Sequence, residues 1–264
     1  MFRCTFTLSK SVLVTGSTKG LGNSLATKFI QNDNYNHVYV HGSSQKTVFK
    51  ALEDLYEKFG SNIAKKQVTG IVCDFGLNEN IDKIPLYSIK LKKQMKVENL
   101  VNFENFLKDN PIDEVVINHA ITQEKLFVQL KNEDINRIMN INSTSYLQLA
   151  RGLLNIWLKT NLRSKKSKKI TTIGSILNNY TKPEIKGNSV YAMSKRNVEF
   201  LSDILNLEYG SKFPWLEIFH FNIPLLRDSS LVTNKTMLDS MDVASDTVDA
   251  VAQKVYVAIT ISRV

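Results

Sequence analysis

A short apolar run followed at once by a cluster of glycines constrains the fold more than any other feature of this chain. Val12-Leu13-Val14 is typical of a buried β-strand, and Thr15-Gly16-Ser17-Thr18-Lys19-Gly20-Leu21-Gly22 follows it, before a helical pattern. Strand, glycine turn and helix in this order aim backbone N–H groups and a helix N-terminus at a pyrophosphate. Gly16 allows the tight turn, while Gly20 and Gly22 let the backbone approach the phosphates and the strand. The turn therefore predicts a dinucleotide site at the first βα junction.

The end of the second expected strand indicates which dinucleotide binds. Residues 37–40 are strand-like and lead into His41-Gly42-Ser43-Ser44. A site for NAD usually places Asp or Glu here to hold the ribose hydroxyls. No acid is present, and Lys19 is either a partner for a 2′-phosphate or a solvated loop charge. Both observations favour NADPH, and we interpret His41 as a polar strand end rather than a proton carrier.

Strand-like runs and helical patterns alternate along the rest of the chain. Further strands are expected at 66–75, 112–117, 170–174 and 216–221, and a last amphipathic helix at 245–259. This alternation predicts an α/β fold, a doubly wound parallel sheet of the Rossmann type. At 264 residues the chain fits a single domain, 1–264. The polar segment near 76–110 is long for a βα connection, so we expect a surface insertion there.

Polar residues at two strand ends and in one helix are candidates for a site. Asp74, at the end of the third strand, either accepts a hydrogen bond from an adenine amino group or caps the following turn. The fourth strand leads into Asn118-His119-Ala120, where a lone histidine is more often structural than catalytic. Asn142 lies on an otherwise apolar helical face, so its amide requires a backbone or water partner.

A tyrosine and a lysine four residues apart supply candidate chemistry. If the segment around Tyr191 and Lys195 is helical, the two side chains share one face. A fixed cation beside a phenol favours the phenolate and lowers the pKa of the tyrosine toward neutrality. A general acid that protonates an oxygen as hydride arrives at the neighbouring carbon needs such a pKa. The spacing alone is weak evidence, and it gains weight from the glycine turn upstream.

Composition narrows the classes of partner and compartment. The net charge of +9 favours an acidic partner, substrate or compartment, or is a solvated basic surface. The sequence contains no recognised nucleic-acid motif and no apolar run near the ~18 residues of a membrane span. Cys4 and Cys73 match no metal or redox spacing, which indicates a reducing compartment.

The first ten residues bear on the cellular address. They contain Arg3, Lys10 and several hydroxyl residues but no acid. This composition is compatible with import into the mitochondrial matrix, with the cytoplasm as the alternative. Strand-like sequence begins near Ser11, which leaves little room for a removable presequence.

Together these features resemble the short-chain dehydrogenase/reductase family across nearly the whole chain. The glycine turn is similar to the family's cofactor motif, and Asn118-His119-Ala120 is similar to its Asn-Asn-Ala-Gly strand end. Four residues match the order and approximate spacing of its catalytic tetrad, namely Asn142, Ser175, Tyr191 and Lys195. The resemblance places cofactor contacts at Gly16, Ser17, Lys19, Gly20, Leu21, Gly22, Ser43, Asp74, Phe75, Asn118, Ala120, Tyr191, Lys195 and Pro224.

Within the family, residues 120–126, 173–175 and the tyrosine segment look most like 3-oxoacyl-[acyl-carrier-protein] reductases. The segment near 76–110 and the C-terminus are similar to the fungal mitochondrial form. The resemblance implies that NADPH delivers hydride to the β-ketone carbon of the 3-oxoacyl group in mitochondrial fatty-acid biosynthesis. Tyr191 would protonate the oxygen and Ser175 would hold the carbonyl. Lys195 would lower the pKa of Tyr191 and bind the nicotinamide ribose, and Asn142 would hold a relay water.

The same resemblance implies an acidic acyl-carrier protein as partner and a homo-oligomer, a dimer or a tetramer. A basic block lies between 159 and 169. In the family a carrier docks on basic residues beside the mouth of the active site, and Arg163 and Lys212 match such positions. The family's final strand, which contributes to tetramer contacts, has no counterpart before Val264.

Some residues depart from the family pattern. His119 stands for Asn and Ile121 for Gly in the strand-end motif, and Leu225 replaces the Gly of the usual Pro-Gly. Ser229 stands near a threonine of the family, and Arg196-Asn197 replaces two small residues after the lysine. We expect the nicotinamide-side loop to differ accordingly.

Two other functions stay open from the sequence. One is reduction of another ketone, such as a steroid-like substrate, and the other is a non-catalytic nucleotide-binding scaffold. Oxidation of NADPH by an acetoacetyl thioester would separate enzyme from scaffold. Comparison of carrier-bound with free ketones would separate the two enzyme readings.

Overall fold

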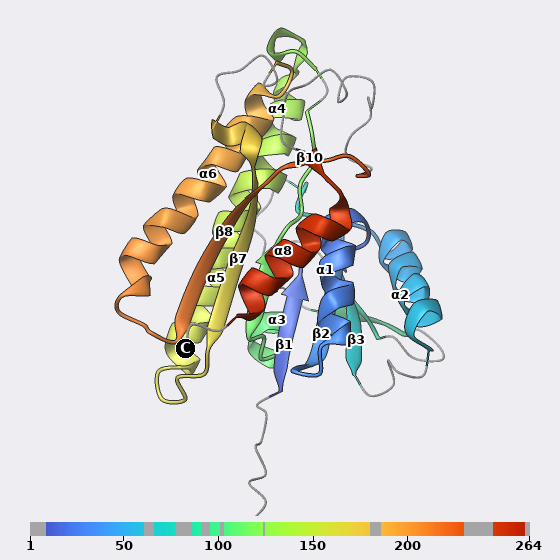
Figure 1. Cartoon of the computed structure of the whole chain (residues 1–264), viewed down its shortest axis with the longest axis vertical. Coiled ribbons are helices and arrows are strands. Elements are labelled where there is room, and N and C mark those ends of the chain that lie inside the picture. The colour runs from blue at the N-terminus through green and yellow to red at the C-terminus, as the bar shows by residue number, and fades with distance from the viewer. Residues whose placement is uncertain are drawn as a thin grey trace, which may run out of the picture.

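The computed structural model describes residues 9–60, 66–77, 86–90, 96–100, 103–123, 125–179, 186–229 and 245–261. Strands and helices alternate along the chain (Figure 1). The strands are β1 (Lys10–Val14), β2 (Tyr35–Gly42), β3 (Gln67–Val72), β4 (Leu86–Lys90), β5 (Lys96–Leu100), β6 (Glu114–Ile117), β7 (Lys168–Ser175), β8 (Leu216–Ile223), β9 (Leu225–Leu226) and β10 (Ser245–Asp246). The α-helices are α1 (Gly20–Gln31), α2 (Gln45–Phe59), α3 (Phe103–Asp109), α4 (Asn132–Met139), α5 (Ser145–Thr160), α6 (Ser189–Leu205) and α8 (Val248–Thr260).

The main sheet has the strand order β5-β4-β3-β2-β1-β6-β7-β8. The six strands from β3 to β8 in this order pair in parallel, and the order reverses direction next to β1. A ligand crevice is expected at such a switch point, outside the carboxyl ends of the strands. The prediction of a doubly wound parallel sheet of the Rossmann type is confirmed.

The described parts of the segment near 76–110 differ from the expected surface insertion. β4 and β5 add an antiparallel pair to the edge of the sheet beyond β3. Leu86, Ile89, Phe103 and Phe106 are buried. These strands are hard to recognise in the sequence, because each has only five residues and the few apolar ones lie in a segment rich in Lys and Asn.

Helices cover both faces of the sheet (Figure 1). On one face α1, α2 and α8 pack on side chains such as Val12 and Val14. On the other face Leu13 points into a second cluster with residues of α3, α5 and α6. Successive strand residues point to opposite faces, so a strand with helices on both sides must be apolar throughout. The continuous apolar run of β1 thus places it at the centre of the molecule.

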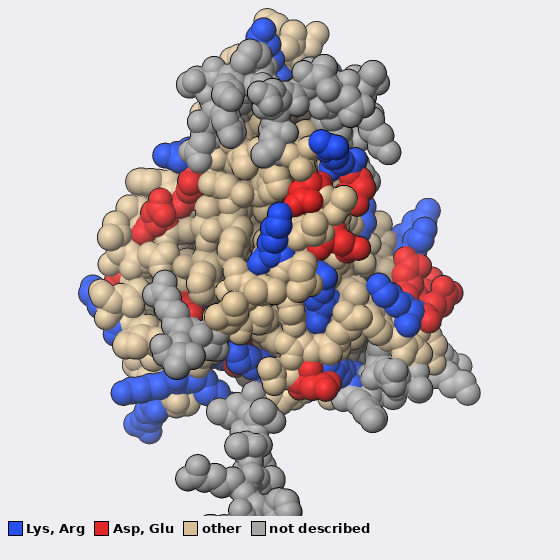
Figure 2. Space-filling model, in the orientation of Figure 1, with Lys and Arg blue, Asp and Glu red and all other residues tan. Residues whose placement is uncertain are grey.

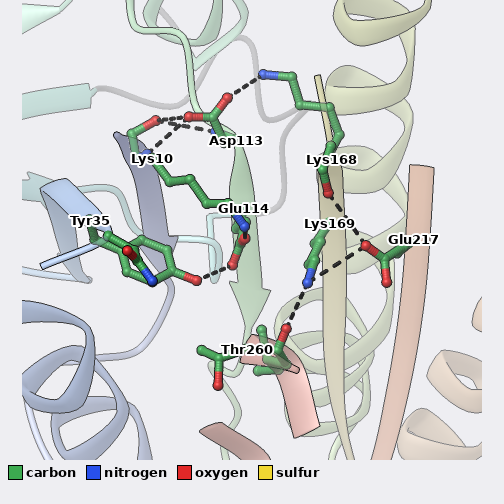
Figure 3. Close-up of polar contacts among 12 residues, drawn as sticks. Lys10, Tyr35, Asp113, Glu114, Lys168, Lys169, Glu217 and Thr260 are labelled. Carbon is green, nitrogen blue, oxygen red and sulfur yellow. Dashed lines mark hydrogen bonds and ion pairs between the residues drawn. The ribbon is translucent and has the colours of Figure 1, made fainter. Parts of the chain in front are cut away.

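Buried charges join the amino ends of the strands (Figure 3). Lys10 Nζ lies 2.8 Å from Glu114 Oε1, and the Tyr35 hydroxyl donates to the other oxygen at 2.7 Å. Lys168 Nζ lies 2.8 Å from Asp113 Oδ1. Burial, followed by the charge of Glu114, raises the pKa of Tyr35 above its ordinary value. Buried charges are tolerated when they are paired, so we interpret these contacts at the amino ends of the strands as structural.

The helices of the described part do not combine the length and the apolar character that crossing a membrane requires.

Candidate active site

Loops that follow the parallel strands meet at one edge of the sheet and enclose a cleft of about 240 Å³. Carboxyl ends of parallel strands share an edge, which explains why residues far apart in sequence gather here. The predicted cofactor residues that line the cleft are Gly16, Lys19, Gly20, Leu21, Ser43, Asp74, Phe75, Asn118, Ala120, Tyr191 and Lys195. The cleft therefore unites the glycine turn with the tyrosine–lysine pair.

The glycine turn is held by a histidine from β2. Gly16 has φ +61°, in the left-handed region that glycine adopts without strain. Its N–H donates to His41 Nδ1 at 3.0 Å, and His41 Nε2 donates to the Cys73 carbonyl at 3.0 Å. Burial lowers the pKa of His41 to about 4, so the ring is neutral and can accept the Gly16 proton. His41 is thus a brace for the turn and not merely a polar strand end.

Two predicted cofactor residues support the turn from behind instead of lining the cleft. A Cβ at Gly22 would lie 2.3 Å from the Gly16 carbonyl oxygen, so only glycine fits. The Ser17 hydroxyl donates to the Val14 carbonyl at 2.6 Å and accepts the His41 N–H at 2.9 Å. Asn118, as predicted, reaches the turn, because its amide donates to the Gly16 carbonyl at 3.1 Å.

The lining carries an excess of positive charge. Lys19, Arg137 and Lys195 line the cleft, and among its described lining residues the acid is Asp74. One Asp74 oxygen accepts the Gly76 N–H at 2.9 Å, so the turn-capping alternative is confirmed for that oxygen. Arg137, in the last turn of α4, was missed because its sequence neighbourhood contains no recognisable pattern. This charge balance suits a dinucleotide with its phosphates.

Asn142 is fully buried in a one-turn π-helix, Asn140–Thr144, which separates α4 from α5. Its amide accepts the Ile121 N–H and donates to the Ile121 carbonyl, both at 2.9 Å. It also donates to Ser194 Oγ at 3.2 Å. The predicted backbone partner is therefore Ile121. Asn142 does not line the cleft, and its role with a relay water stays a prediction.

The remaining tetrad residues meet at the end of β7. Tyr191 is half-buried in the first turn of α6, and Ser175, the last residue of β7, forms a hydrogen bond with it. Lys195 is buried and donates to the Ile173 carbonyl at 2.9 Å and to the Tyr146 hydroxyl at 3.3 Å. Tyr191 and Lys195 thus line the cleft, and Ser175 lies behind Tyr191 without lining it.

The electrostatics differ from the expected tyrosine–lysine pair. Burial raises the pKa of Tyr191, and the hydrogen bond with Ser175 opposes this rise. Burial also lowers the pKa of Lys195 to about 7, which weakens the positive charge that was expected to act on the phenol. The expectation that Lys195 lowers the pKa of Tyr191 is therefore wrong for this geometry, and Ser175 has that effect.

Tyr146 and His119 form a buried layer behind the lysine. The Tyr146 hydroxyl donates to the His119 carbonyl at 2.8 Å. His119 Nδ1 lies 2.8 Å from Thr15 Oγ1, and Nε2 lies 2.7 Å from Ser145 Oγ. Burial, with nearby His41 and Lys195, holds the pKa of His119 well below its ordinary value. The structural interpretation of His119 is confirmed, whereas the sequence showed no sign of Tyr146.

On the nicotinamide side, the cleft is lined by Ile223, Leu226 and Ser229, and not by Pro224. Its neighbour Ile223 lines the cleft, and the contact of Pro224 with the cofactor stays a prediction. Leu226 belongs to β9, which pairs in parallel with β10. This short pair includes Leu225, the departure from Pro-Gly, which is paired with Ser245.

Arg163 and Lys212 do not lie beside the mouth of the cleft of their own chain. Arg163 precedes β7 and Lys212 precedes β8, so both lie at the amino ends of strands whose carboxyl ends form the cleft. A loop before a parallel strand lies at the opposite edge from the loop after it. Figure 2 shows Lys and Arg gathered at the lower edge of the molecule, below these strands. The predicted placement beside the mouth is wrong for a single chain.

The described residues contain no group of three or more His, Cys, Asp or Glu side chains that could hold a metal ion.

Comparisons with known proteins agree with this geometry. The family model for short chain dehydrogenases matches residues 10–213. The 3-oxoacyl-[acyl-carrier-protein] reductase FabG of Chlamydia trachomatis is 25% identical over 206 residues, 78% of this chain and 70% of that protein. The 3alpha-hydroxysteroid dehydrogenase of Mediterraneibacter gnavus is 27% identical over 204 residues, 76% of this chain and 68% of that protein.

Among solved structures, a short-chain dehydrogenase from Sphingobium yanoikuyae in complex with NADPH superposes with a TM-score of 0.69 at 19% identity. The match covers 95% of this chain and 84% of that one. At this identity the likeness shows the fold alone.

Proposed function

The chain belongs to the short-chain dehydrogenase family of oxidoreductases, and we propose that it uses NADPH to reduce the β-ketone of 3-oxoacyl-[acyl-carrier-protein]. One observation carries the proposal. Tyr191 and Lys195 line the same cleft as the glycine turn, and Ser175 forms a hydrogen bond with Tyr191. A proton donor thus stands at one end of a dinucleotide-shaped groove.

The lining residues fit NADPH in three places. The turn from Gly16 to Gly20 opens a glycine-lined approach to the N-terminus of α1, where a pyrophosphate is favoured. The exposed Lys19 and Ser43 line the same cleft, with no acid at the end of β2, which suits a 2′-phosphate. Lys195 would bind the nicotinamide ribose.

The chemistry divides between the cofactor and the cleft wall. When bound, NADPH supplies the hydride. Tyr191 gives its proton to the carbonyl oxygen, and the hydrogen bond with Ser175 favours this release because it opposes the rise in the Tyr191 pKa that burial causes. Ser175 holds the same oxygen by a hydrogen bond, as donors placed on a developing oxyanion do.

The choice of a carrier-bound substrate rests on two kinds of support. Reductases of this kind are among the relatives in sequence, and the chain has a net charge of +9, which suits an acidic carrier. Arg163 and Lys212 are the proposed docking residues. Because they lie opposite the cleft of their own chain, we propose that they serve the cleft of a second copy in a homo-oligomer.

The test is oxidation of NADPH by an acetoacetyl thioester, free and carrier-bound, with NADH as comparison. We expect NADPH and the carrier-bound substrate to be preferred. Tyr191→Phe should keep NADPH affinity and lose at least about 100-fold in kcat, since positioned acid catalysis supplies about 10²–10⁴-fold. Unchanged turnover in this variant would remove Tyr191 from the reaction, and no turnover of any ketone by the wild type would favour a scaffold.

A second candidate is reduction of a steroid-like or other free ketone. The resemblance to a 3alpha-hydroxysteroid dehydrogenase favours it. A kcat/KM for a free steroid ketone above that for the carrier-bound thioester would decide for this candidate.

The mitochondrial matrix stays our proposal for the address. Of the first ten residues, which motivate it, 1–8 lie outside the described residues. Import of the full chain into isolated mitochondria, with protection from added protease, tests it.

A further inference from the structure

The helix that carries Tyr191 lacks a cap of its own. The first N–H groups of a helix have no partner within it, and a side chain at the N-cap usually accepts those of the second and third residues. In α6 these are the N–H groups of Val190 and Tyr191. The N-cap residue, Asn188, makes no such hydrogen bond. Another part of the chain must supply the acceptor.

Gln123 supplies it from the loop after β6. Its Oε1 accepts the Val190 N–H at 2.8 Å and the Tyr191 N–H at 3.2 Å. Its Nε2 donates to the Lys125 carbonyl at 2.8 Å and to Ser189 Oγ at 3.2 Å. The side chain is 5% exposed. These four bonds use both acceptor sites and both donors of one buried amide.

The loop that carries Gln123 is attached to the cofactor side of the cleft as well. Asn118 in this loop donates to the Gly16 carbonyl, and Ile121 exchanges two hydrogen bonds with the Asn142 amide. Six residues of chain therefore link the glycine turn, Asn142 and the first turn of α6. The position of the Tyr191 backbone relative to the cofactor groove depends on the last of these links, which is Gln123.

We propose that Gln123 is a positioning residue that caps α6 and sets the place of the Tyr191 hydroxyl relative to the reacting carbonyl. The expected effect of Gln123 on turnover rests on the proposed function, whereas its expected effect on helix α6 does not. Gln123 does not itself line the cleft, and it contacts Tyr191 at the backbone N–H, so it acts through the backbone of α6. A displacement of about 1 Å at a reacting group costs on the order of 10²-fold in rate.

The test compares Gln123→Met with Gln123→Glu in the full chain. Met has a similar length and no hydrogen-bonding amide, so all four bonds are lost while the site stays filled. Glu keeps an oxygen for the two N–H groups, and a helix N-terminus favours its charge. The matched control is Gln129→Met, since Gln129 is exposed and bonds only the Leu126 N–H of its own loop.

Two readouts decide the inference. Amide hydrogen exchange should become at least about tenfold faster at 189–192 in Gln123→Met, with recovery in Gln123→Glu and no change in Gln129→Met. In steady-state kinetics, kcat should fall about 10- to 100-fold in Gln123→Met with NADPH affinity within about twofold, and the solvent deuterium effect on kcat should rise.

The outcomes separate this inference from the proposed function. Unchanged exchange at 189–192 in Gln123→Met would overturn the capping role. Faster exchange with unchanged kcat, or a loss of NADPH affinity equal to the loss in kcat, would overturn the positioning role. If the wild type reduces no ketone, the proposed function fails together with the effect on turnover, and the exchange measurement still decides the cap.

Discussion

At the scale of single residues, burial determines the chemistry of the cleft more than charge does. Lys195 and His41 are both buried, and burial is the largest cause of the low pKa of each. A buried base favours its neutral form, because water no longer solvates the cation. The pattern of Tyr191 and Lys195 in the sequence indicated that the two share a helix, but the burial that changes their pKa values depends on the tertiary fold.

Lys195 should make stability depend on pH. Its pKa is about 7 in the folded chain and near its ordinary value, 10.5, in the unfolded chain. Between these values the unfolded chain binds a proton that the folded chain does not, so stability rises with pH. From pH 7.5 to 8.5 the free energy of unfolding should rise by about 1 kcal/mol more in the wild type than in Lys195→Met. Urea titrations at the two pH values measure this change in the free energy of unfolding. An equal change in the wild type and in Lys195→Met would contradict a buried lysine with a lowered pKa.

At the scale of the elements, substitutions at Gly20 and Gly22 of the glycine turn should separate an effect on NADPH binding from an effect on folding. Gly20 has φ +57° and open space where a Cβ would lie, whereas a Cβ at Gly22 would lie 2.3 Å from the Gly16 carbonyl oxygen. Gly20→Ala should lower the free energy of unfolding by about 1–2 kcal/mol, the cost of a left-handed residue, and weaken NADPH binding by filling the groove. Gly22→Ala should lower it by more, because the backbone of the turn must move.

Denaturant midpoints and NADPH titration measure the two effects. The expected order of midpoints is wild type, Gly20→Ala, Gly22→Ala. A Gly20→Ala variant that binds NADPH with wild-type affinity would show that the pyrophosphate does not approach this glycine.

Lys169 connects the last helix to the sheet. Its Nζ is buried, donates to the Ile259 carbonyl near the end of α8 at 2.8 Å and lies 3.6 Å from Glu217 Oε1 (Figure 3). Removal of one partner leaves the other charge uncompensated. Lys169→Met should therefore lower the free energy of unfolding by about 3–5 kcal/mol, and Lys169→Met/Glu217→Gln by less. Thermal and urea unfolding check the order, and a double variant less stable than the single one would contradict the pairing.

At the scale of the whole molecule, strand and glycine patterns predicted the sheet and the cleft, and the family resemblance added several of the residues that line it. They did so because the carboxyl ends of parallel strands must share one edge. Arg137 and Tyr146 could not be found in this way, since each reaches the site from a helix face with no distinguishing neighbours. The misplacement of Arg163 and Lys212 has another cause, because their assignment came from the family resemblance, whereas both precede their strands and so lie at the amino ends of β7 and β8.

The exposed face of α6 offers a way for those two residues to reach a cleft. Met193, Phe200 and Leu207 lie seven residues apart and are 61%, 64% and 76% exposed, so they form one apolar stripe along α6 and the turn after it. α6 begins at the cleft with Tyr191 and ends toward Lys212. In the homo-oligomer that we propose, a two-fold axis at Phe200 would pair the stripe with itself in antiparallel fashion, and each basic end would then approach the other copy's cleft.

Phe200→Glu should therefore split the oligomer and affect only one class of substrate. A charge at the centre of a self-complementary stripe meets its own copy, and like charges at an interface cost several kcal/mol. We expect a monomer in light scattering, at least about tenfold lower kcat/KM with a carrier-bound 3-oxoacyl substrate, and turnover of a small 3-oxoacyl thioester within about twofold. Tyr56→Glu is the matched control, because Tyr56 is an exposed apolar residue of α2, on the other face of the sheet. Equal losses with both substrates would place the stripe within the catalytic machinery, and an intact oligomer would move the interface elsewhere.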